Sequence, residues 1–274
     1  MTSSSKAPLW LNELALPGTV WIASDIHLGE HNPGTAAAFF RFLERARREA
    51  DALVLCGDIF EAWIGDDHAL RDPPAWLARA LTALRDTAHD IPLWLGHGNR
   101  DFLMGAALAR SLGARLLDDE ILLTTAAGTL LLAHGDQYCT DDTGYQRLRR
   151  LVRAPWVQRA FLALPLALRR RIAAWARARS RRARRGKSMR IMDVNPRAVA
   201  DALAASGSDV LVHGHTHRPA VHALDAGGRA CRRFVLPDWD YDQPPGRGGW
   251  LVLNAGGPRL MLDEPLGGGD TPGR

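Results

Sequence analysis

The sequence has few cysteines and no long apolar run. Its three cysteines, Cys56, Cys139 and Cys231, are an odd number without a CxxC pair, which argues against a disulfide framework and a zinc ribbon. The longest apolar stretch, residues 160–168, falls far short of the roughly 18 residues that a membrane span requires. Residues 1–7 are polar and lack the features of a secretory signal. We therefore expect a cytoplasmic protein.

Acidic residues are missing from one long segment. Between Thr143 and Met192 the chain has sixteen lysines or arginines and no aspartate or glutamate. The net charge of the 274 residues is +5, so the rest of the chain carries 19 basic against 30 acidic side chains, a net charge of −11. A net positive charge suggests a nucleic-acid or membrane partner. The uneven distribution of the charge along the chain indicates instead an acidic protein with a basic insert. We expect the two parts to have different functions.

Short runs of aliphatic residues alternate with helical patterns. Strands are expected at residues 19–23, 52–56, 92–95, 129–133, 210–212 and 250–253. Helices are expected at 33–50, 73–87 and 195–206, each beginning beside a proline that can occupy the first turn. The apolar stripe expected for the first helix consists of Ala37, Phe40, Leu43 and Ala46. This alternation predicts an α/β sandwich.

Residues 143–192 interrupt the alternation. Their pattern is helical, in two or three pieces separated by Pro155 and Pro165. We predict a core formed by residues 1–142 and 193–274, with 143–192 inserted as a helical cap. Residues 226–249, including the aromatic and acidic segment 238–242, are expected to form a loop whose role the sequence does not indicate, and the Gly-rich tail from residue 263 is expected to be disordered. Asp66 and Asp67 are expected in an exposed loop.

Polar clusters follow five of the expected strands. They are Ser24-Asp25-Ile26-His27, Gly57-Asp58, Gly98-Asn99-Arg100-Asp101, His134-Gly135-Asp136 and His213-Gly214-His215-Thr216-His217. Ligand sites of open α/β sheets lie beyond the carboxyl ends of the strands, so these clusters can converge. Their candidate metal ligands are Asp25, His27, Asp58, Asn99, His134, His215 and His217. Seven oxygen and nitrogen ligands suit two divalent ions of Mn²⁺, Fe²⁺ or Zn²⁺, with Asp58 as the natural bridge.

Other polar residues near these clusters are expected to play supporting parts. We expect Asp101 and Asp136 to orient a turn or a ligand histidine, and His97 to lie behind the ligands. His213 lies within an expected strand and is predicted to be structural.

The ordered motifs DxH, GD, GNxD, H and GHTH resemble those of the calcineurin-like metallophosphoesterase superfamily. The resemblance spans residues 25–217 and implies a four-layer α/β/β/α sandwich with an inserted helical cap. It implies that one metal ion is held by Asp25, His27, Asp58 and His217, and the second by Asp58, Asn99, His134 and His215.

Longer motif variants at residues 96–102, 134–142 and 191–195 are similar to those of the UDP-2,3-diacylglucosamine diphosphatases of lipid A biosynthesis. This similarity, over roughly residues 20–220, implies cleavage of UDP-2,3-diacylglucosamine to UMP and 2,3-diacylglucosamine 1-phosphate (lipid X) at the cytoplasmic face of the inner membrane. It implies two divalent ions, by family inference Mn²⁺, and in-line attack on the α phosphorus by a water that both ions activate. Asp58, Asn99 and Arg100 are the expected catalytic residues.

The same resemblance implies substrate contacts from the site and the cap. The expected contact residues are Asn99, Arg100, Asp142, Tyr145, Arg177, Ser180, Arg184, Lys187 and His215. Arg184 departs from the asparagine that relatives often carry there. The apolar stretch 156–168 is flanked by arginines and predicts an amphipathic surface that lies on an anionic bilayer.

Arg100 stands where most members of the superfamily have histidine. Arginine keeps its proton because its pKa lies above about 12, so Arg100 cannot act as a general acid. A phosphate leaving group, with a second pKa near about 6, needs no such acid. A fixed positive charge suits a diphosphate transition state. The residue therefore favours cleavage between two phosphates over monoester hydrolysis.

Two other functions stay open on the sequence alone. A nuclease or nucleotide phosphodiesterase would use the basic insert to bind a phosphate backbone, with strong salt dependence; against this, the insert alternates Arg with Leu, Ala and Trp. A non-catalytic module that has lost its metals is opposed by the presence of all seven ligands. We expect a lipid-linked UDP-sugar substrate, peripheral contact with the inner membrane, no nucleic-acid partner and no obligate protein partner.

Overall fold

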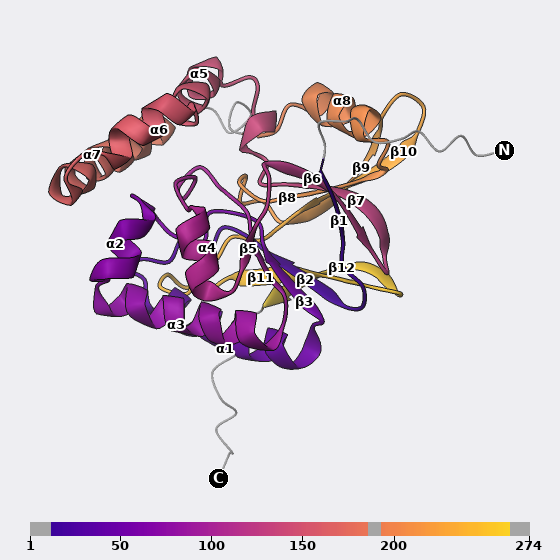
Figure 1. Ribbon diagram of the computed structural model, residues 1–274. Helices are drawn as coiled ribbons and strands as arrows, with labels where there is room; N and C mark the ends of the chain where they lie inside the picture. Colours follow the sequence, from indigo (N-terminus) through magenta and orange to yellow (C-terminus); the bar gives the residue numbers. More distant parts are fainter. Residues whose placement is uncertain (1–11, 186–192, 264–274) are drawn as a thin grey trace, which may run out of the picture.

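The computed structural model describes residues 12–185 and 193–263, which form two six-stranded sheets packed face to face (Figure 1). One sheet has the order β1-β6-β7-β8-β10-β9, with β1 at Asn12–Ala15, β6 at Glu120–Thr125, β7 at Gly128–Ala133, β8 at Val210–His213, β9 at Ala220–Asp225 and β10 at Ala230–Val235. The other has the order β12-β11-β2-β3-β4-β5, with β2 at Val20–Ala23, β3 at Ala52–Leu55, β4 at Leu93–Leu95, β5 at Arg115–Leu116, β11 at Gly248–Asn254 and β12 at Gly257–Asp263.

Helices cover the outer face of each sheet (Figure 1). The second sheet is covered by α1 at Pro33–Glu49, α3 at Ala75–Asp90 and α4 at Ala106–Leu112, with α2 at Asp66–Arg71 beside them, and the first sheet by α8 at Pro196–Ser206. Three apolar clusters fill the spaces between these layers, represented by Phe39 and Leu84, by Ile22 and Val212, and by Leu203 and Leu211. The predicted four-layer α/β/β/α sandwich is therefore confirmed.

The strands with an apolar run, β2, β3, β4, β7, β8 and β11, match the sequence prediction, whereas strands richer in polar residues, such as β6 and β10, were not predicted. Residues 226–249 were expected to be a loop, but they contain β10 and the start of β11. The paired Arg232 and Arg233 lie within β10, so its pattern resembles a polar loop. The expected stripe of α1 is confirmed in part. Leu43 and Ala46 are buried as predicted, whereas Ala37 is exposed and the buried face also includes Phe39 and Phe42.

The prediction of an exposed loop at Asp66 and Asp67 is wrong. Both residues begin α2, and the Asp66 carboxylate accepts hydrogen bonds from the backbone N–H groups of Gly105 (2.9 Å) and Leu108 (2.8 Å). This arrangement caps α4 from a distant part of the chain, a contact that no local pattern reveals. The tail from residue 264 lies outside the described residues.

The basic insert contains three helices, which form one arm beside the sandwich (Figure 1): α5 at Thr143–Val152, α6 at Pro155–Leu162 and α7 at Leu166–Arg185. Pro155 begins α6 and Pro165 precedes α7, as expected from the sequence. The exact boundaries of the core and the cap stay a prediction. Within the two described ranges, no helix is long and apolar enough to cross a membrane.

Ion pairs attach the cap to the core at both ends. In α5, Arg149 Nε donates to the buried carboxylate of Asp136 (2.8 Å). In α7, the buried Arg169 donates to the Ile64 carbonyl (2.6 Å) and to the Asp67 carboxylate (2.8 Å). Part of the positive charge of the insert is therefore paired with acidic residues of the core.

Candidate active site and metal centre

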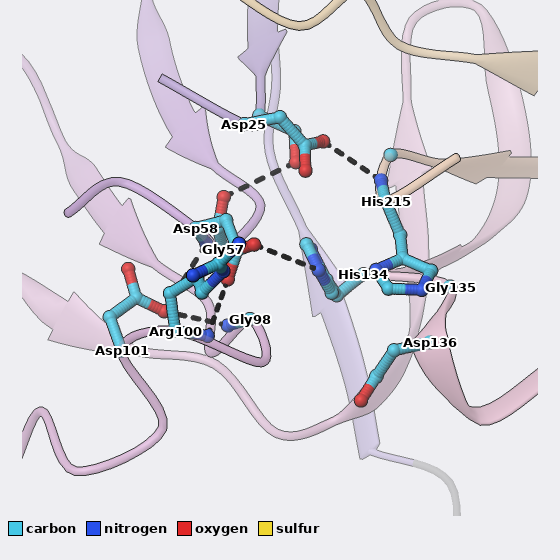
Figure 2. A network of polar contacts seen from close by, with 12 residues as sticks. Asp25, Gly57, Asp58, Gly98, Arg100, Asp101, His134, Gly135, Asp136 and His215 are labelled. Carbon is cyan, nitrogen blue, oxygen red and sulfur yellow. Dashed lines mark hydrogen bonds and ion pairs between the residues drawn. The ribbon is translucent and has the colours of Figure 1, made fainter. Parts of the chain in front are cut away.

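Polar side chains that follow four buried strands meet at one end of the sandwich. Asp25 follows β2, Asp58 follows β3, His134 follows β7 and His217 follows β8. Figure 2 shows Asp25, Asp58, His134 and His215 around one region, with Arg100 beside Asp58. The strands before these residues are apolar and buried, so they hold the loops rigidly. The predicted convergence of the strand ends is present.

Two groups of side chains place their ligand atoms close enough to share a cation. Asp25, His27 and His217 form one group, and Asp25, Asp58 and His134 form the other; the ligand atoms of each group lie within 4.8 Å of one another. Asp25 belongs to both. Asp58 Oδ2 also lies 3.8 Å from His27 Nδ1 and 3.9 Å from His134 Nε2. Both carboxylates therefore lie between the two sets of histidines.

The backbone at these ligands is strained. Among the described residues, the non-glycine positions with a positive φ are Asp25 (57°), His27 (54°), Asp58 (51°), His215 (66°) and His217 (54°). Each such position costs on the order of 1–3 kcal/mol and persists only where its surroundings hold it. All five are candidate metal ligands. The fold thus holds these five candidate ligands in strained conformations.

Buried atoms without partners fit a bound cation. Asn99 Oδ1 and His134 Nε2 are buried and lack a hydrogen-bond partner among the described residues. Burying such an atom unpaired is costly, and a divalent ion bound at either atom would satisfy it. His134 Nδ1 donates to the Cys56 carbonyl (3.0 Å), which leaves Nε2 as the free ligand atom. The donor set of carboxylate, amide and imidazole groups suits a borderline or hard divalent metal.

A family model described as "Calcineurin-like phosphoesterase" matches residues 18–219. The chain belongs to this family. Three relatives named "UDP-2,3-diacylglucosamine hydrolase" are similar over most of their length. The Bordetella parapertussis protein is 54% identical (90% of this chain, 96% of that protein), that of Klebsiella pneumoniae 50% (81% and 90%) and that of Escherichia coli O7:K1 48% (81% and 90%). This calcineurin-like phosphoesterase is therefore a metal-dependent hydrolase.

Burial and close partners perturb the acid–base groups of the phosphoesterase site. Burial raises the pKa of Asp58 to about 7. Burial opposes protonation of His217, but hydrogen bonds to Asp238 and Asp25 outweigh it and raise its pKa to about 10. Burial lowers the pKa of His27 and of His215 to about 3. Protons on Asp58 and His217 therefore compete with any cation that binds there.

We expect Mn²⁺ affinity to rise between about pH 6 and about pH 8, because binding must displace protons. Asp58 is protonated below its raised pKa of about 7 and ionised above it, so the competition weakens as pH rises. His217 should release a further proton throughout this range, since its pKa is raised to about 10. Calorimetric titration in two buffers of different ionisation enthalpy measures the released protons. A pH-independent affinity without proton release would contradict this expectation.

Asp101 holds two of the ligand loops together, as the sequence predicts. Its carboxylate accepts hydrogen bonds from the backbone N–H groups of Gly98 (2.8 Å), Ile59 (2.7 Å) and Asp58 (3.2 Å). Asp136 has a different role from the one expected. It accepts hydrogen bonds from the Tyr145 hydroxyl (2.7 Å) and Arg149, both of the cap. Asp136 therefore joins the cap to the loop that carries His134.

Two supporting histidines make backbone contacts away from the ligand groups. His97 Nε2 donates to the Met104 carbonyl (2.7 Å), and the ring of His213 is buried with Nδ1 2.8 Å from the Gly214 carbonyl. His215 lies closer to the site. Its backbone N–H donates to Asp25 Oδ2 (2.8 Å), and its ring centroid lies 5.3 Å from that of His134.

The expected substrate contacts of the cap are only partly placed. Tyr145 stacks beside His215, with ring centroids 6.1 Å apart, and its hydroxyl is bonded to Asp136. Asp142 caps α5 by accepting from Tyr145 N–H (3.0 Å). Arg177 lines the groove described below. Lys187 and the side chains of Ser180 and Arg184 lie outside the described residues.

Arg100 lies at the edge of the metal centre, with a partner that the sequence motifs do not include. Its backbone N–H donates to Asp58 Oδ1 (2.7 Å), and its guanidinium Nη1 pairs with Glu61 Oε1 (3.3 Å). Glu61 Oε2 is also 3.9 Å from His27 Nδ1. Glu61 lies three residues after Asp58. Its position shortly after a strand end was the only feature of the sequence that could have indicated a role in the site. The pair holds the Arg100 side chain beside the ligands.

An open groove of about 320 Å³ joins this site to the cap. Its polar lining comes from the core and the cap and consists of Glu61, Asn99, Arg100, Asp136, Tyr145, Arg149, Arg153, Gln158 and Arg177. Its apolar lining, contributed by core loops and by all three cap helices, consists of Ala62, Trp63, Ile64, Phe102, Leu103, Leu148, Val152, Val157, Phe161, Ile172, Ala173 and Ala176. A ligand with a charged head and apolar chains fits a groove with this division.

Proposed function

We propose that this phosphoesterase hydrolyses the diphosphate of UDP-2,3-diacylglucosamine at the α phosphorus, releasing UMP and 2,3-diacylglucosamine 1-phosphate in lipid A biosynthesis. The observation that carries the proposal is the groove beside Arg100, whose lining from the core loops and the three cap helices is mainly apolar. The names of the relatives support the same substrate. A mainly apolar lining favours acyl chains over a polynucleotide backbone. Two of the arginines in the lining, Arg149 and Arg153, are already paired with Asp136 and Asp119.

The residues of the site have distinct roles in this reaction. We assign one divalent ion to Asp25, His27, Asp58 and His217 and a second to Asp58, Asn99, His134 and His215, with Mn²⁺ as the proposed metal. Bound ions supply Lewis acidity and a nucleophilic water. Arg100 neutralises the charge that develops on the phosphate oxygens and carries no transferable proton. Its ion pair with Glu61 keeps the guanidinium in place before substrate binds.

The proposal is tested by incubating the purified protein with UDP-2,3-diacylglucosamine and Mn²⁺ and measuring UMP. We expect Mn²⁺-dependent release of UMP and of the sugar 1-phosphate in equal amounts. Chelation of the metal should stop the reaction, and readdition of Mn²⁺ should restore it. Failure of the metal-loaded wild-type protein to form UMP would overturn the proposal.

Two neighbouring alanines of α7 test the apolar part of the groove. Ala173 lines the groove, whereas Ala174 is exposed and lies outside it. Ala173→Asp should raise KM for the diacylated substrate at least ~10-fold, because it places a charge where an acyl chain binds. Ala174→Asp makes the same change of charge and helix propensity and should leave KM within about twofold. Equal KM values for both variants would contradict a lipid-binding groove.

We also propose that the cap contacts the membrane from the cytoplasmic side. Trp156 on α6 and Trp175 on α7 are 66% and 64% exposed, and the sequence of α7 is rich in arginine. Apolar and cationic residues together suit an anionic lipid surface. We expect sedimentation with vesicles that contain phosphatidylglycerol, and loss of most of it in the double variant Trp156→Ser and Trp175→Ser. Equal sedimentation of both proteins would refute the contact.

A further inference from the structure

The aromatic and acidic segment Asp238–Asp242 lies directly behind the metal centre. Asp238 is 4% exposed, and its Oδ2 is 3.3 Å from Nδ1 of His217. The next residue, Trp239, donates its backbone N–H to the carbonyl of Asp25 (3.0 Å). One short segment therefore contacts two candidate ligands from the side away from the cation. The sequence motifs gave this segment no role.

The surroundings of Asp238 hold its carboxylate in place. Arg247 donates from Nε to Oδ1 (3.2 Å) and from Nη2 to Oδ2 (2.8 Å), a bidentate arrangement that fixes the carboxylate plane. Asp240 and Arg247 also exchange two backbone hydrogen bonds of 2.9 Å. The indole of Trp239 packs edge-on against Phe42 in the core. A carboxylate held from several directions can orient a neighbour without moving itself.

The hydrogen bond to Asp238 determines which nitrogen of His217 faces the cation. A neutral imidazole carries one proton, and a carboxylate at Nδ1 places that proton on Nδ1. Nε2 then keeps its lone pair. This nitrogen lies 3.3 Å from Asp25 Oδ1 and 3.4 Å from His27 Nε2, inside the ligand group. Without Asp238 the ring could take either tautomer and rotate.

We propose that Asp238, held by Arg247, is a positioning residue that orients His217 as a metal ligand. The proposal rests on the family's metal centre and is independent of the substrate assigned above. His134 is oriented in the same way, but by the neutral carbonyl of Cys56. A carboxylate binds an imidazole N–H more strongly than a neutral carbonyl does, so Asp238 fixes His217 more firmly than the Cys56 carbonyl fixes His134. Asp238 therefore affects metal affinity without touching the metal or the substrate.

Metal titration without substrate tests this role. The metal-free wild-type chain and its Asp238→Ala, Asp238→Asn and Asp242→Ala variants are titrated with Mn²⁺ by calorimetry. Asp238→Ala should weaken one binding step about 10–100-fold and leave the other nearly unchanged. Asp238→Asn, which retains an acceptor oxygen without the charge, should fall between Asp238→Ala and the wild type. This graded rescue distinguishes orientation from simple loss of structure.

Asp242→Ala is the matched control, because it removes the same charge from the same segment. Asp242 accepts hydrogen bonds from Gly34 N–H (2.8 Å) and Thr35 N–H (2.9 Å) at the start of α1 and contacts no ligand. It should lower Tm and keep Mn²⁺ affinity. Wild-type affinity in both Asp238 variants, or an equal loss in Asp242→Ala, would overturn the proposal. If Asp238→Ala does not fold, the Mn²⁺ affinity of Asp238→Asn alone tests the proposal. If the Mn²⁺ affinities change as expected but the wild-type protein releases no UMP, only the proposed substrate is refuted.

Discussion

Replacement of Asp58 by alanine is expected to lower the rate of UMP release at least ~10³-fold. The Asp58 carboxylate lies between the histidines of both ligand groups, and its other oxygen accepts the backbone N–H of Arg100 (2.7 Å). Its loss removes a ligand that both ions are proposed to share and also frees the loop that carries Arg100. Mass-spectrometric metal analysis of the same sample should show fewer than two bound ions.

Asp86→Ala provides the control for this loss. Asp86 is exposed on α3, so the same substitution there should leave UMP release and metal content unchanged. An Asp58→Ala protein that retains both ions and more than about a tenth of the wild-type kcat would rule out Asp58 as a shared ligand.

Arg100→Ala should lower kcat for the diphosphate about 10²–10³-fold, because the guanidinium is proposed to stabilise charge that develops in the transition state. Its side chain is 12% exposed and held by Glu61, so the guanidinium needs little reorientation during the reaction. The measurement is steady-state UMP release over a range of substrate concentrations. Metal content should stay at the wild-type level, since the Arg100 side chain belongs to neither ligand group.

Two further variants sharpen this test. Arg110→Ala removes an exposed arginine of α4 and should have no effect on kcat. Arg100→His places a titratable group beside the ligands and should allow hydrolysis of phosphate monoesters, whose leaving group needs a proton. An unchanged kcat in Arg100→Ala would remove Arg100 from the mechanism.

The sequence predicts those parts of the fold whose signals are local. Strands β2 and β3 are apolar throughout because both of their faces are buried, and α8 begins with an asparagine cap followed by proline. Strand β9 is mostly exposed, and β10 contains two arginines, so neither shows an apolar run. Helix α2 has no side-chain cap, and Gly65 precedes it. Its stability comes from distant contacts such as the pair of Asp67 with Arg169.

In the candidate site too, the residues with a local sequence signal were predicted and those defined by distant contacts were not. Its ligands follow strand ends in recognisable motifs, because the strand end itself places them. Glu61 and Asp238 belong to no motif, and both are defined by partners far away in the sequence: Arg100 for the former, His217 and Arg247 for the latter. Asp136 was expected to serve a turn or a histidine, but its partners Tyr145 and Arg149 lie in the cap. Such pairings depend on the assembled fold.

The attachment of the cap by arginine–carboxylate pairs has a consequence for its modularity. Removing residues 143–192 would leave the buried Asp136 without Arg149 and Asp67 without Arg169, so the core would keep acidic groups whose partners had gone. The cap and the core therefore match each other through complementary charges. A chimera that takes the cap of one relative and the core of another should succeed only when these pairs are exchanged as a set.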